Sequence, residues 1–325
     1  MKTRIVVAAA LLAALSSKGA RAETCSLAQM ASLDMTLGKS GVPEVPITVN
    51  GTNYNFMVDT AGLYSKISDD LAQKLNLKQT PTGQEIYSVT GMTHAKSVDI
   101  DSLKLGANEA KHFHLMVGSG LNMSKNADGV LAGDLLQLFD VEFDFAKGKL
   151  NLFSQNHCPG KVVYWTQTGY AEIPFRFASG PIQTTGHINF DMTLDGHELE
   201  TDFDTGSSWT WIRHKAALRV FGLDDASPGM QRDPNSKDDS PIFFKKFELL
   251  QLGGVAVKNP EIEIITDHVE DAFRMAHSEK SRDDPVYGSS ISLEALTLGM
   301  NVISKLHIYL AYKEHKVYVT AADAH

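Results

Sequence analysis

The chain has 325 residues, which is enough for two domains, and its 43% apolar and 21% charged residues are typical of a globular protein. Thirty Lys and Arg residues stand against 39 Asp and Glu residues, for a formal charge of −9. This acidic balance disfavours nucleic acid and anionic membrane surfaces as partners.

Residues 1–22 have the organisation of a secretory signal peptide. Lys2 and Arg4 precede an apolar run of 11 residues at 5–15, and Ala-Arg-Ala at 20–22 forms an A-x-A cleavage site. The run is too short to span a bilayer, and the alternative is a buried helix at the N-terminus. Cleavage would remove four of the 30 basic residues and no acidic residue, which leaves a charge of −13. We therefore expect export, to a bacterial periplasm or as a secreted protein, with no membrane insertion of the mature chain.

The chain has two cysteines, Cys25 and Cys158. Since an exported chain enters an oxidising compartment, we expect them to form a disulfide. In the chain-entropy model, closing so long a loop contributes about 4–5 kcal/mol. The alternative is two unpaired thiols.

The local patterns predict a strand-rich chain with few short helices. Ser68 is a predicted N-cap for a helix over DDLAQKLNL, and GDLLQLF at 133–139 predicts a second, shorter helix. Alternation of Phe and Val with acidic residues predicts a half-buried strand at 139–145, which AKG turns into the hairpin partner KLNLF. Near the C-terminus, LHIYLAY, KEH and KVYVT repeat this hairpin.

Two connecting segments separate these patterns. Pro159-Gly160 ends the first strand-rich half, and residues 161–186 are expected to be a linker. The stretch 225–241 is rich in charge and in turn-forming residues, which predicts a mobile loop or local disorder.

The sequence repeats itself in three blocks that keep their order. At a shift of 145 residues, TVNGTNYNFMVDTAG (48–62) aligns with TLDGHELETDFDTGS (193–207). At a shift of 147, the Leu-x-Leu-Gly of residues 103–106 aligns with residues 250–253, and at a shift of 167, residues 130–153 align with 297–320. The growing shift places about 20 extra residues in the second half, mostly between Thr266 and Leu293. We infer a duplicated domain.

The first block places Asp59-Thr60 on Asp204-Thr205. An apolar strand that runs into D-T-G or D-T-A, followed later by an apolar-apolar-Gly strand before a helix, resembles the retropepsin and pepsin clan of aspartic peptidases. The short lobes are similar to bacterial retropepsin-like members fused in tandem. The resemblance covers nearly all of the mature chain. It implies two homologous β-barrel lobes of the acid-protease type related by a pseudo-twofold axis. Together with the signal peptide at 1–22 and the linker at 161–186, this gives an N-terminal lobe at 23–160 and a C-terminal lobe at 187–325.

The chemistry explains the duplicated aspartate. Hydrolysis of a peptide without a metal or a covalent nucleophile needs a base to activate water and an acid to protonate the amide. Two carboxylates about 3 Å apart do not both ionise easily and share one proton. The resemblance implies that Asp59 and Asp204 form this dyad, and a solvated turn is the alternative reading of an isolated Asp-Thr-Gly.

The resemblance also implies supporting roles. Thr60 and Thr205 would join the two loops across the axis, and the main-chain N–H groups of Ala61 and Gly206 would hold the inner carboxylate oxygens. Ser207 would donate a hydrogen bond to the outer oxygen of the Asp204 carboxylate.

Two positions depart from the pattern of the family. Ala61 stands where Gly is usual, and Ala132 aligns with Gly299. Alanine keeps the N–H group but has less backbone freedom. The two changes either compensate each other or indicate a degraded loop in the N-terminal lobe.

The resemblance implies a β-hairpin flap at residues 86–98, with Tyr87, Thr90, Gly91 and Met92 at or near its tip. A protein or peptide substrate would bind under it as an extended strand. Tyr87 is a candidate for substrate contact, although a tyrosine on a strand more often packs against its neighbours.

No cofactor and no metal is expected. His112 and His114 lack a third ligand at a suitable spacing, and the polar cluster at 267–271 is read as a solvated face. The sequence therefore predicts an exported aspartic endopeptidase. The alternatives are an impaired, peptide-binding module of the same fold and an enzyme that pairs identical lobes from two chains.

Overall fold

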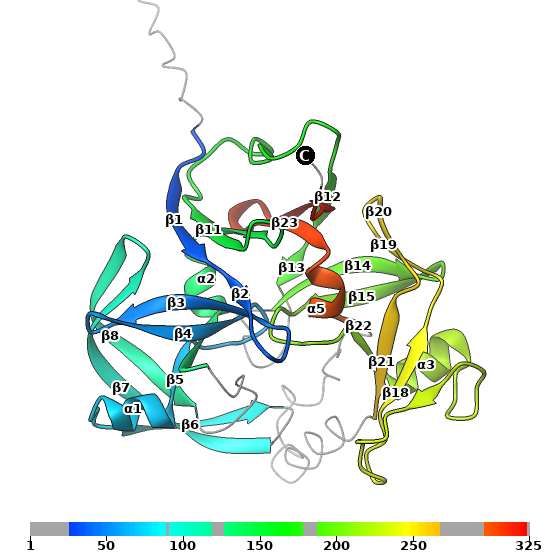
Figure 1. The fold of residues 1–325 in the computed structure, drawn as a ribbon, viewed down its shortest axis with the longest axis horizontal. Coiled ribbons are helices and arrows are strands. Elements are labelled where there is room, and N and C mark those ends of the chain that lie inside the picture. The colour runs from blue at the N-terminus through cyan, green and yellow to red at the C-terminus, as the bar shows by residue number, and fades with distance from the viewer. Residues whose placement is uncertain (1–25, 89–90, 119–126, 178–186, 267–295, 324–325) are drawn as a thin grey trace, which may run out of the picture.

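Two β-rich lobes of the same topology meet at a shared six-stranded sheet (Figure 1). The computed structural model describes residues 26–88, 91–118, 127–177, 187–266 and 296–323. The predicted signal peptide therefore lies outside the described residues. The expectation of a mainly β protein with two homologous lobes and few short helices is confirmed.

The N-terminal lobe is one mixed eight-stranded sheet with two short helices. Its elements are β2 (Thr36–Leu37), β3 (Pro43–Val49), β4 (Thr52–Asp59), β5 (Lys66–Ser68), α1 (Asp69–Lys74), β6 (Thr80–Ser88), β7 (Gly91–Leu105), β8 (Asn108–Gly118), β9 (Gly129–Ala132) and α2 (Gly133–Leu136).

The C-terminal lobe repeats this arrangement in a second sheet. Its elements are β13 (Arg176–Phe177), β14 (Ile188–Leu194), β15 (His197–Phe203), β16 (Trp211–Arg213), α3 (His214–Phe221), β17 (Gln231–Arg232), β18 (Phe243–Lys246), β19 (Leu249–Leu252), β20 (Val255–Lys258), β21 (Glu261–Ile265), β22 (Leu296–Leu298) and α5 (Met300–Ile303).

Strand pairing shows that the duplication extends to topology. In the N-terminal lobe β9 runs parallel to β4 and antiparallel to β5, and in the C-terminal lobe β22 runs parallel to β15 and antiparallel to β16. Apolar residues of these strands belong to one hydrophobic core that extends through both lobes, and every residue of β9 and β22 is buried. Most of the extra residues of the second half lie outside the described ranges.

The predicted helices form where the sequence places them. Ser68 caps α1, because its hydroxyl accepts a hydrogen bond of 3.0 Å from the N–H of Leu71, and the two acidic residues of the first turn favour that end of the helix. The second predicted helix is the single turn α2.

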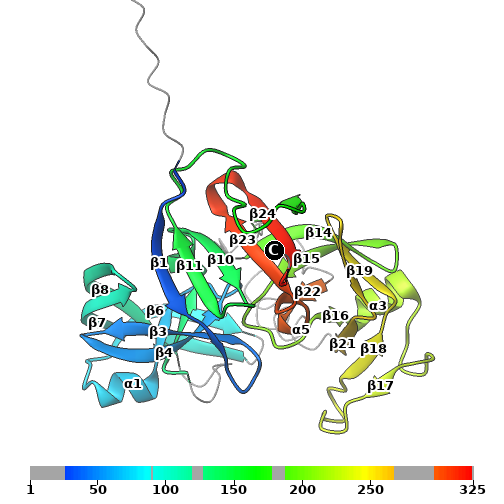
Figure 2. The same ribbon diagram turned by 45° about the horizontal axis from the view of Figure 1, so that its top comes forward.

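Three strands from each half build the shared sheet, and Figure 2 shows five of them, from β1 to β24, side by side. The strands are β1 (Gln29–Asp34), β11 (Lys149–Phe153) and β10 (Asp140–Asp144), then β23 (Leu306–Ala311), β24 (Lys316–Ala321) and β12 (Ala171–Pro174), with the 3₁₀ turn η1 (Tyr312–Glu314) between β23 and β24. Segment 161–186, expected to be a linker, therefore supplies β12 and β13, which pair with β24 and β14.

The register of the central pair locates the pseudo-twofold axis. Val141 faces Leu310 and Phe143 faces Ile308 across β10 and β23. The shift of 167 residues maps each of these pairs onto the other. It maps Glu142 onto its own partner, Tyr309, so the axis passes through this pair.

The expectation that β10 is half-buried is wrong. Its acidic residues, Asp140, Glu142 and Asp144, are buried as completely as its apolar ones. Segment 161–166 covers this face: Tyr164 donates to Glu142 at 2.8 Å, and Trp165 stacks on His307, which contacts Glu142 at 2.9 Å. Burying these carboxylates is tolerated because each of them has polar partners, which offset the cost of removing it from water.

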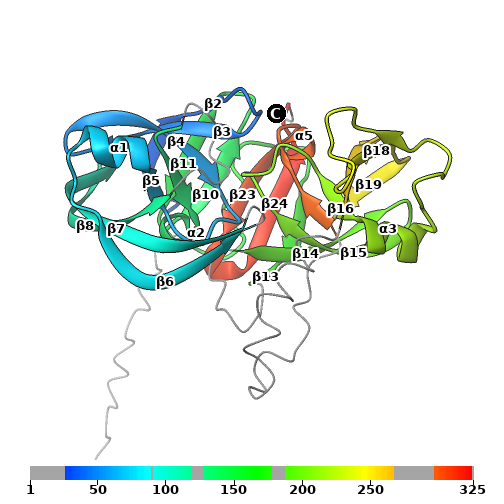
Figure 3. The same cartoon turned by 90° about the horizontal axis from the view of Figure 1, so that it is seen from below.

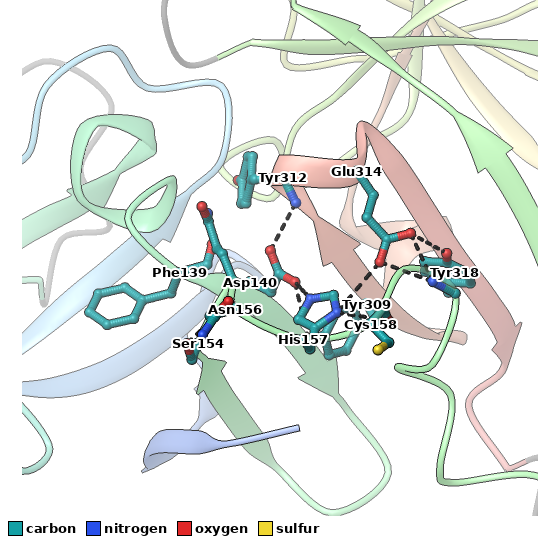
Figure 4. A network of polar contacts seen from close by, with 12 residues as sticks. Phe139, Asp140, Ser154, Asn156, His157, Cys158, Tyr309, Tyr312, Glu314 and Tyr318 are labelled. Carbon is teal, nitrogen blue, oxygen red and sulfur yellow. Dashed lines mark hydrogen bonds and ion pairs between the residues drawn. The ribbon is translucent and has the colours of Figure 1, made fainter. Parts of the chain in front are cut away.

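A polar network joins the two lobes at the same sheet (Figure 4). Asp140 of the N-terminal half accepts two hydrogen bonds from the C-terminal half. The main-chain N–H of Tyr312 donates one at 3.0 Å, and the side-chain hydroxyl of Tyr309 donates the other at 3.3 Å. His157 lies between Asp140 and Glu314, with the Glu314 carboxylate 3.6 Å from His157 Nδ1. The network therefore adds polar contacts between the two halves to the strand pairing of β10 with β23.

The charged stretch 225–241 contains β17 and several turns. Asp224 bonds to Ser227 at 2.7 Å and Arg232 to Asp238 at 2.6 Å, which gives the stretch local order. Whether the loop is mobile stays a prediction.

Candidate active site

Each aspartate of the repeated motif lies where a central strand leaves its sheet. Asp59 is the last residue of β4 and pairs with Ala132 at the end of β9. Asp204 follows β15, and its N–H donates to the carbonyl of Leu298 at the end of β22 at 3.1 Å. Equivalent strand pairs therefore carry the two carboxylates to the junction of the lobes.

The two loops are joined across the pseudo-twofold axis by reciprocal hydrogen bonds. The Thr60 hydroxyl donates to the carbonyl of Phe203 at 2.8 Å, and the Thr205 hydroxyl donates to the carbonyl of Val58, also at 2.8 Å. Each hydroxyl also accepts from the main-chain N–H of the other threonine, at 3.1 and 3.0 Å. Both threonines are fully buried, so the bonds are shielded from water and hold the loops in one relative position.

The main chain holds one oxygen of each carboxylate. The Ala61 N–H donates to Asp59 Oδ1 at 3.1 Å, and the Gly206 N–H donates to Asp204 Oδ1 at 2.7 Å. Gly206 lies between the two carboxylates, because a Cβ atom on it would be 2.8 Å from Asp59 Oδ1 and 3.1 Å from Asp204 Oδ1. The carboxylates of the repeat therefore face one small space.

Ala61 fits without backbone strain. Neither Ala61 nor its counterpart Gly206 has a positive φ, so both lie in backbone regions that alanine adopts freely. Gly206 is needed for space rather than for conformation, since an added Cβ would lie 2.7 Å from Asp59 Cγ.

The lobes also differ at two further aligned positions close to the aspartates, 62 with 207 and 132 with 299. In the N-terminal lobe residue 62 is Gly, and an added Cβ would lie 3.1 Å from the methyl group of Ala132. In the C-terminal lobe the equivalents are Ser207 and Gly299, and a Cβ on Gly299 would lie 2.2 Å from the carbonyl oxygen of Trp209. Each lobe thus carries a side chain at one of these two aligned positions, Ala132 in the N-terminal lobe and Ser207 in the C-terminal lobe.

The predicted bond from Ser207 to Asp204 is wrong. The Ser207 hydroxyl donates to the carbonyl of Trp209 at 2.8 Å. A serine has one hydroxyl proton, so this proton is not available to the carboxylate.

Burial sets the protonation of the dyad. It raises the pKa of Asp59 above its ordinary value, against the charges of Lys66 and His187. It raises the pKa of Asp204 further, and the negative charges of Asp59 and Asp202 act in the same direction. The arrangement favours one shared proton, as expected of two close carboxyl groups.

A second set of contacts, not predicted from the sequence, anchors the loops to the short helices. The N–H and hydroxyl of Ser65 donate to Asp134 Oδ1 at 2.9 and 2.6 Å, and the N–H of Thr210 donates to Asn301 Oδ1 at 2.7 Å. The repeat aligns Ser65 with Thr210 and Asp134 with Asn301. The sequence signal that could have predicted these contacts is that both aligned pairs consist of polar residues.

The predicted flap is a β-hairpin. β6 and β7 pair antiparallel, with Tyr87 opposite Met92 and Ser88 opposite Gly91. Thr90 lies outside the described residues, as does the rest of the two-residue connection. Figures 1 and 3 show the hairpin extending from the N-terminal lobe toward the junction with the C-terminal lobe.

The predicted disulfide is not decided, since Cys25 lies outside the described residues.

His114 contacts Asp99 at 2.7 Å on the surface. None of the helices in the described ranges has the length and apolar character needed to cross a bilayer.

Comparisons with known proteins agree with this geometry. Residues 45–135, most of the N-terminal lobe, match the sequence model of a family described as Aspartyl protease. The crystal structure of basic 7S globulin from soybean is similar over 92% of this chain and 99% of that chain, with a TM-score of 0.50 and 10% identity. The crystal structure of edgp is similar over 90% of this chain and 94% of that chain, with a TM-score of 0.51 and 8% identity.

A comparison with curated proteins finds no match. The structural likeness, at such low identity, concerns the fold, and the family match concerns the half that contains Asp59. The chain therefore resembles the aspartyl proteases in the sequence of its N-terminal lobe and has the aspartic protease fold in both lobes.

Proposed function

We propose that the protein is an aspartic endopeptidase whose dyad is Asp59 and Asp204. The observation that carries the proposal is the pair of carboxylates around Gly206, on loops joined by reciprocal threonine hydrogen bonds. Each carboxylate is held by a main-chain N–H, and burial disfavours ionisation of both. One ionised and one protonated carboxyl group supply the base and the acid that amide hydrolysis needs.

The substrate of this enzyme is a protein segment in an extended conformation. β6 ends the eight-stranded sheet in the described part of the chain, so the β6–β7 hairpin has a free edge for main-chain hydrogen bonds. An extended peptide is recognised through such bonds, and side-chain pockets then select its sequence. Tyr87, Thr90, Gly91 and Met92 are the proposed flap residues.

The protein acts after export. The basic start, apolar run and A-x-A site of residues 1–22 support this proposal, and the substrates would be exported or membrane-anchored proteins. N-terminal sequencing of the chain from the extracellular or periplasmic fraction should give a start at residue 23, whereas an intact N-terminus would contradict export by this signal.

Isosteric variants test the enzymatic function. Asp59→Asn and Asp204→Asn keep an acceptor for the N–H groups of Ala61 and Gly206 but cannot exchange a proton. We expect each to abolish cleavage of a peptide library read by mass spectrometry, with an unchanged circular dichroism spectrum. Asp191→Asn, which alters an exposed carboxylate, is the control. Full cleavage by the dyad variants would refute the proposal.

A peptide-binding module of the same fold is the second candidate, because Ala61 and Ala132 depart from the usual pattern. The negative φ of Ala61 weakens that argument, because alanine adopts such a backbone conformation freely. The wild-type chain distinguishes the two: a binding module would retain peptides from the library without cutting them between pH 3 and 8.

A further inference from the structure

In the C-terminal lobe, β18 takes the place that the middle of β7 has in the N-terminal lobe. Ser97 of β7 faces Met116 of β8, and Phe244 of β18 faces Glu263 of β21. A shift of 147 residues maps the first pair onto the second, and the same shift aligns the Leu-x-Leu-Gly segments that follow β7 and β18. β18 and β19 together are therefore the counterpart of β7.

The strand that completes the flap also has a counterpart. Thr80 of β6 faces Ser97, and Gln231 of β17 faces Phe244, the residue aligned with Ser97. From these pairs the chain continues through residues 81–96 in the flap and through residues 232–243 in the C-terminal lobe. Residues 231–244 therefore form a second hairpin, slightly shorter than the flap and equivalent to it in position.

The second hairpin keeps its form beyond the two residues of β17. The N–H of Asp233 donates to the carbonyl of Ile242 at 2.8 Å, and Lys237 and Ser240 form an antiparallel bridge close to the tip. In the described part of the chain β17 ends the ten-stranded sheet, as β6 ends the eight-stranded sheet. Each lobe thus presents the edge of a hairpin that an extended peptide can join through main-chain hydrogen bonds.

The base of the second hairpin packs against the loop of Asp204. Trp209, five residues after Asp204, has its ring centroid 5.1 Å from that of Phe244 in β18. The N–H of Glu263 in β21, the strand that pairs with β18, donates to the carbonyl of Thr210 at 2.9 Å. In Figure 1, β6 and β18 both lie in the lower half of the view, away from the shared sheet. The second hairpin is therefore attached to one aspartate loop and lies on the same side of the molecule as the flap.

The two hairpins differ in the chemistry of their tips. Tyr87 and Met92 lie opposite each other beside the connection of the flap. The tip of the second hairpin is Asn-Ser-Lys-Asp-Asp-Ser at 235–240, which contains no apolar residue, and its three charged residues are exposed. Charged groups lose less free energy when they are covered by polar groups than when they are covered by apolar ones. The second hairpin therefore favours polar substrate residues, and the flap favours apolar ones.

We propose that the second hairpin covers the substrate together with the flap, so that the enzyme prefers segments that are apolar on one side of the scissile bond and polar on the other. The axis that relates the two aspartate loops also relates the two hairpins. Residues on the two sides of the scissile bond therefore face different hairpins. This inference rests on the proposed peptidase function of the same site and adds the class of substrate.

Shortening the second hairpin tests its contact with substrate. Replacement of residues 234–241 by Asn-Gly closes the hairpin after the pair of Asp233 and Ile242 with a two-residue turn. The variant should lose the preference for polar residues on one side of the scissile bond and keep the apolar preference on the other. Its kcat/KM for the best wild-type peptide should fall about tenfold, as for the loss of one or two hydrogen bonds. An unchanged cleavage profile with unchanged kcat/KM would overturn the inference.

A charge reversal tests the same contact without shortening the chain. Lys237→Glu should raise kcat/KM for peptides with Lys or Arg on the polar side, relative to peptides with Asp or Glu there, by about fivefold. Lys258→Glu is the matched control, because Lys258 is exposed on β20 at the opposite end of the same sheet. Identical profiles for the two variants would overturn the inference, also if the shortened variant fails to fold.

Hydrogen–deuterium exchange separates this inference from the proposed function. The probe is the library peptide that the wild-type chain binds or cleaves best, added to the Asp204→Asn variant. We expect slower amide exchange in both the flap and the second hairpin when the peptide is bound. Slower exchange in the flap alone refutes the inference and leaves the peptidase proposal intact.

Cleavage by Asp59→Asn and Asp204→Asn refutes the peptidase instead, and exchange in residues 231–244 still decides whether the second hairpin contacts the peptide. A library from which the wild-type chain neither binds nor cleaves any peptide refutes both.

Discussion

At the scale of single residues, Gly206 is the position where a small change should have the largest effect. An added Cβ would lie 2.7 Å from Asp59 Cγ, so Gly206→Ala must displace that carboxylate from its N–H donor. We expect a loss of kcat/KM of about a hundredfold, typical of a misplaced catalytic group. The matched change in the other lobe, Ala61→Gly, should leave kcat/KM nearly unchanged. Equal activity of Gly206→Ala and wild type would contradict this reading of the site.

Single residues also show which parts of the site a sequence reveals. Asp59, Thr60, Asp204 and Thr205 are marked by identity within a repeat, and their cross-axis bonds follow from that symmetry. The hydrogen-bond acceptor of the Ser207 hydroxyl could not be predicted. The Asp204 carboxylate and the carbonyl of Trp209, which accepts the bond, are both within three residues of it in the sequence.

At the scale of elements, the one-turn helices α2 and α5 serve as anchors for the aspartate loops. Asn301 of α5 accepts from the N–H of Thr210 at 2.7 Å and donates to the carbonyl of Glu261 at 2.8 Å. Asn301→Ala should lower the free energy of unfolding by about 1–3 kcal/mol, because both main-chain groups lose their partner. Urea denaturation measures this, and Asn53→Ala, at an exposed hydrogen bond, should have a much smaller effect. Similar values for the two variants would show that α5 is not an anchor.

Elements were predictable where the pattern is local. The Ser68 cap and the two C-terminal hairpins of the lobes depend on neighbouring residues alone. The burial of Asp140, Glu142 and Asp144 depends on residues far along the chain, among them Tyr164 and His307. Alternation along a strand predicts which side chains share a face, but it does not predict that a distant segment covers the polar face.

At the scale of the whole molecule, the buried carboxyl groups should make stability depend on pH. Burial raises the pKa of Asp59, Asp134, Asp140 and Asp204, so the folded chain holds protons that the unfolded chain has released. Their contribution to stability is fully present below the ordinary aspartate pKa of about 3.9 and is lost as the pH rises through the raised values. We expect the free energy of unfolding to fall as the pH rises from about 4 toward neutral.

Asp204→Asn tests this linkage, because the amide stays neutral at every pH and still accepts the hydrogen bond from Gly206. Urea denaturation between pH 3 and 8 should give the variant a flatter pH profile than wild type and a higher free energy of unfolding at neutral pH. Asp191→Asn, at an exposed carboxylate, should follow the wild-type profile. A variant less stable than wild type at neutral pH would contradict the expectation. The expected result would mean that the Asp204 carboxyl group lowers the stability of the folded chain at neutral pH. The reason is that the proposed chemistry needs a proton on a buried carboxyl group, and at this pH the unfolded chain has released that proton.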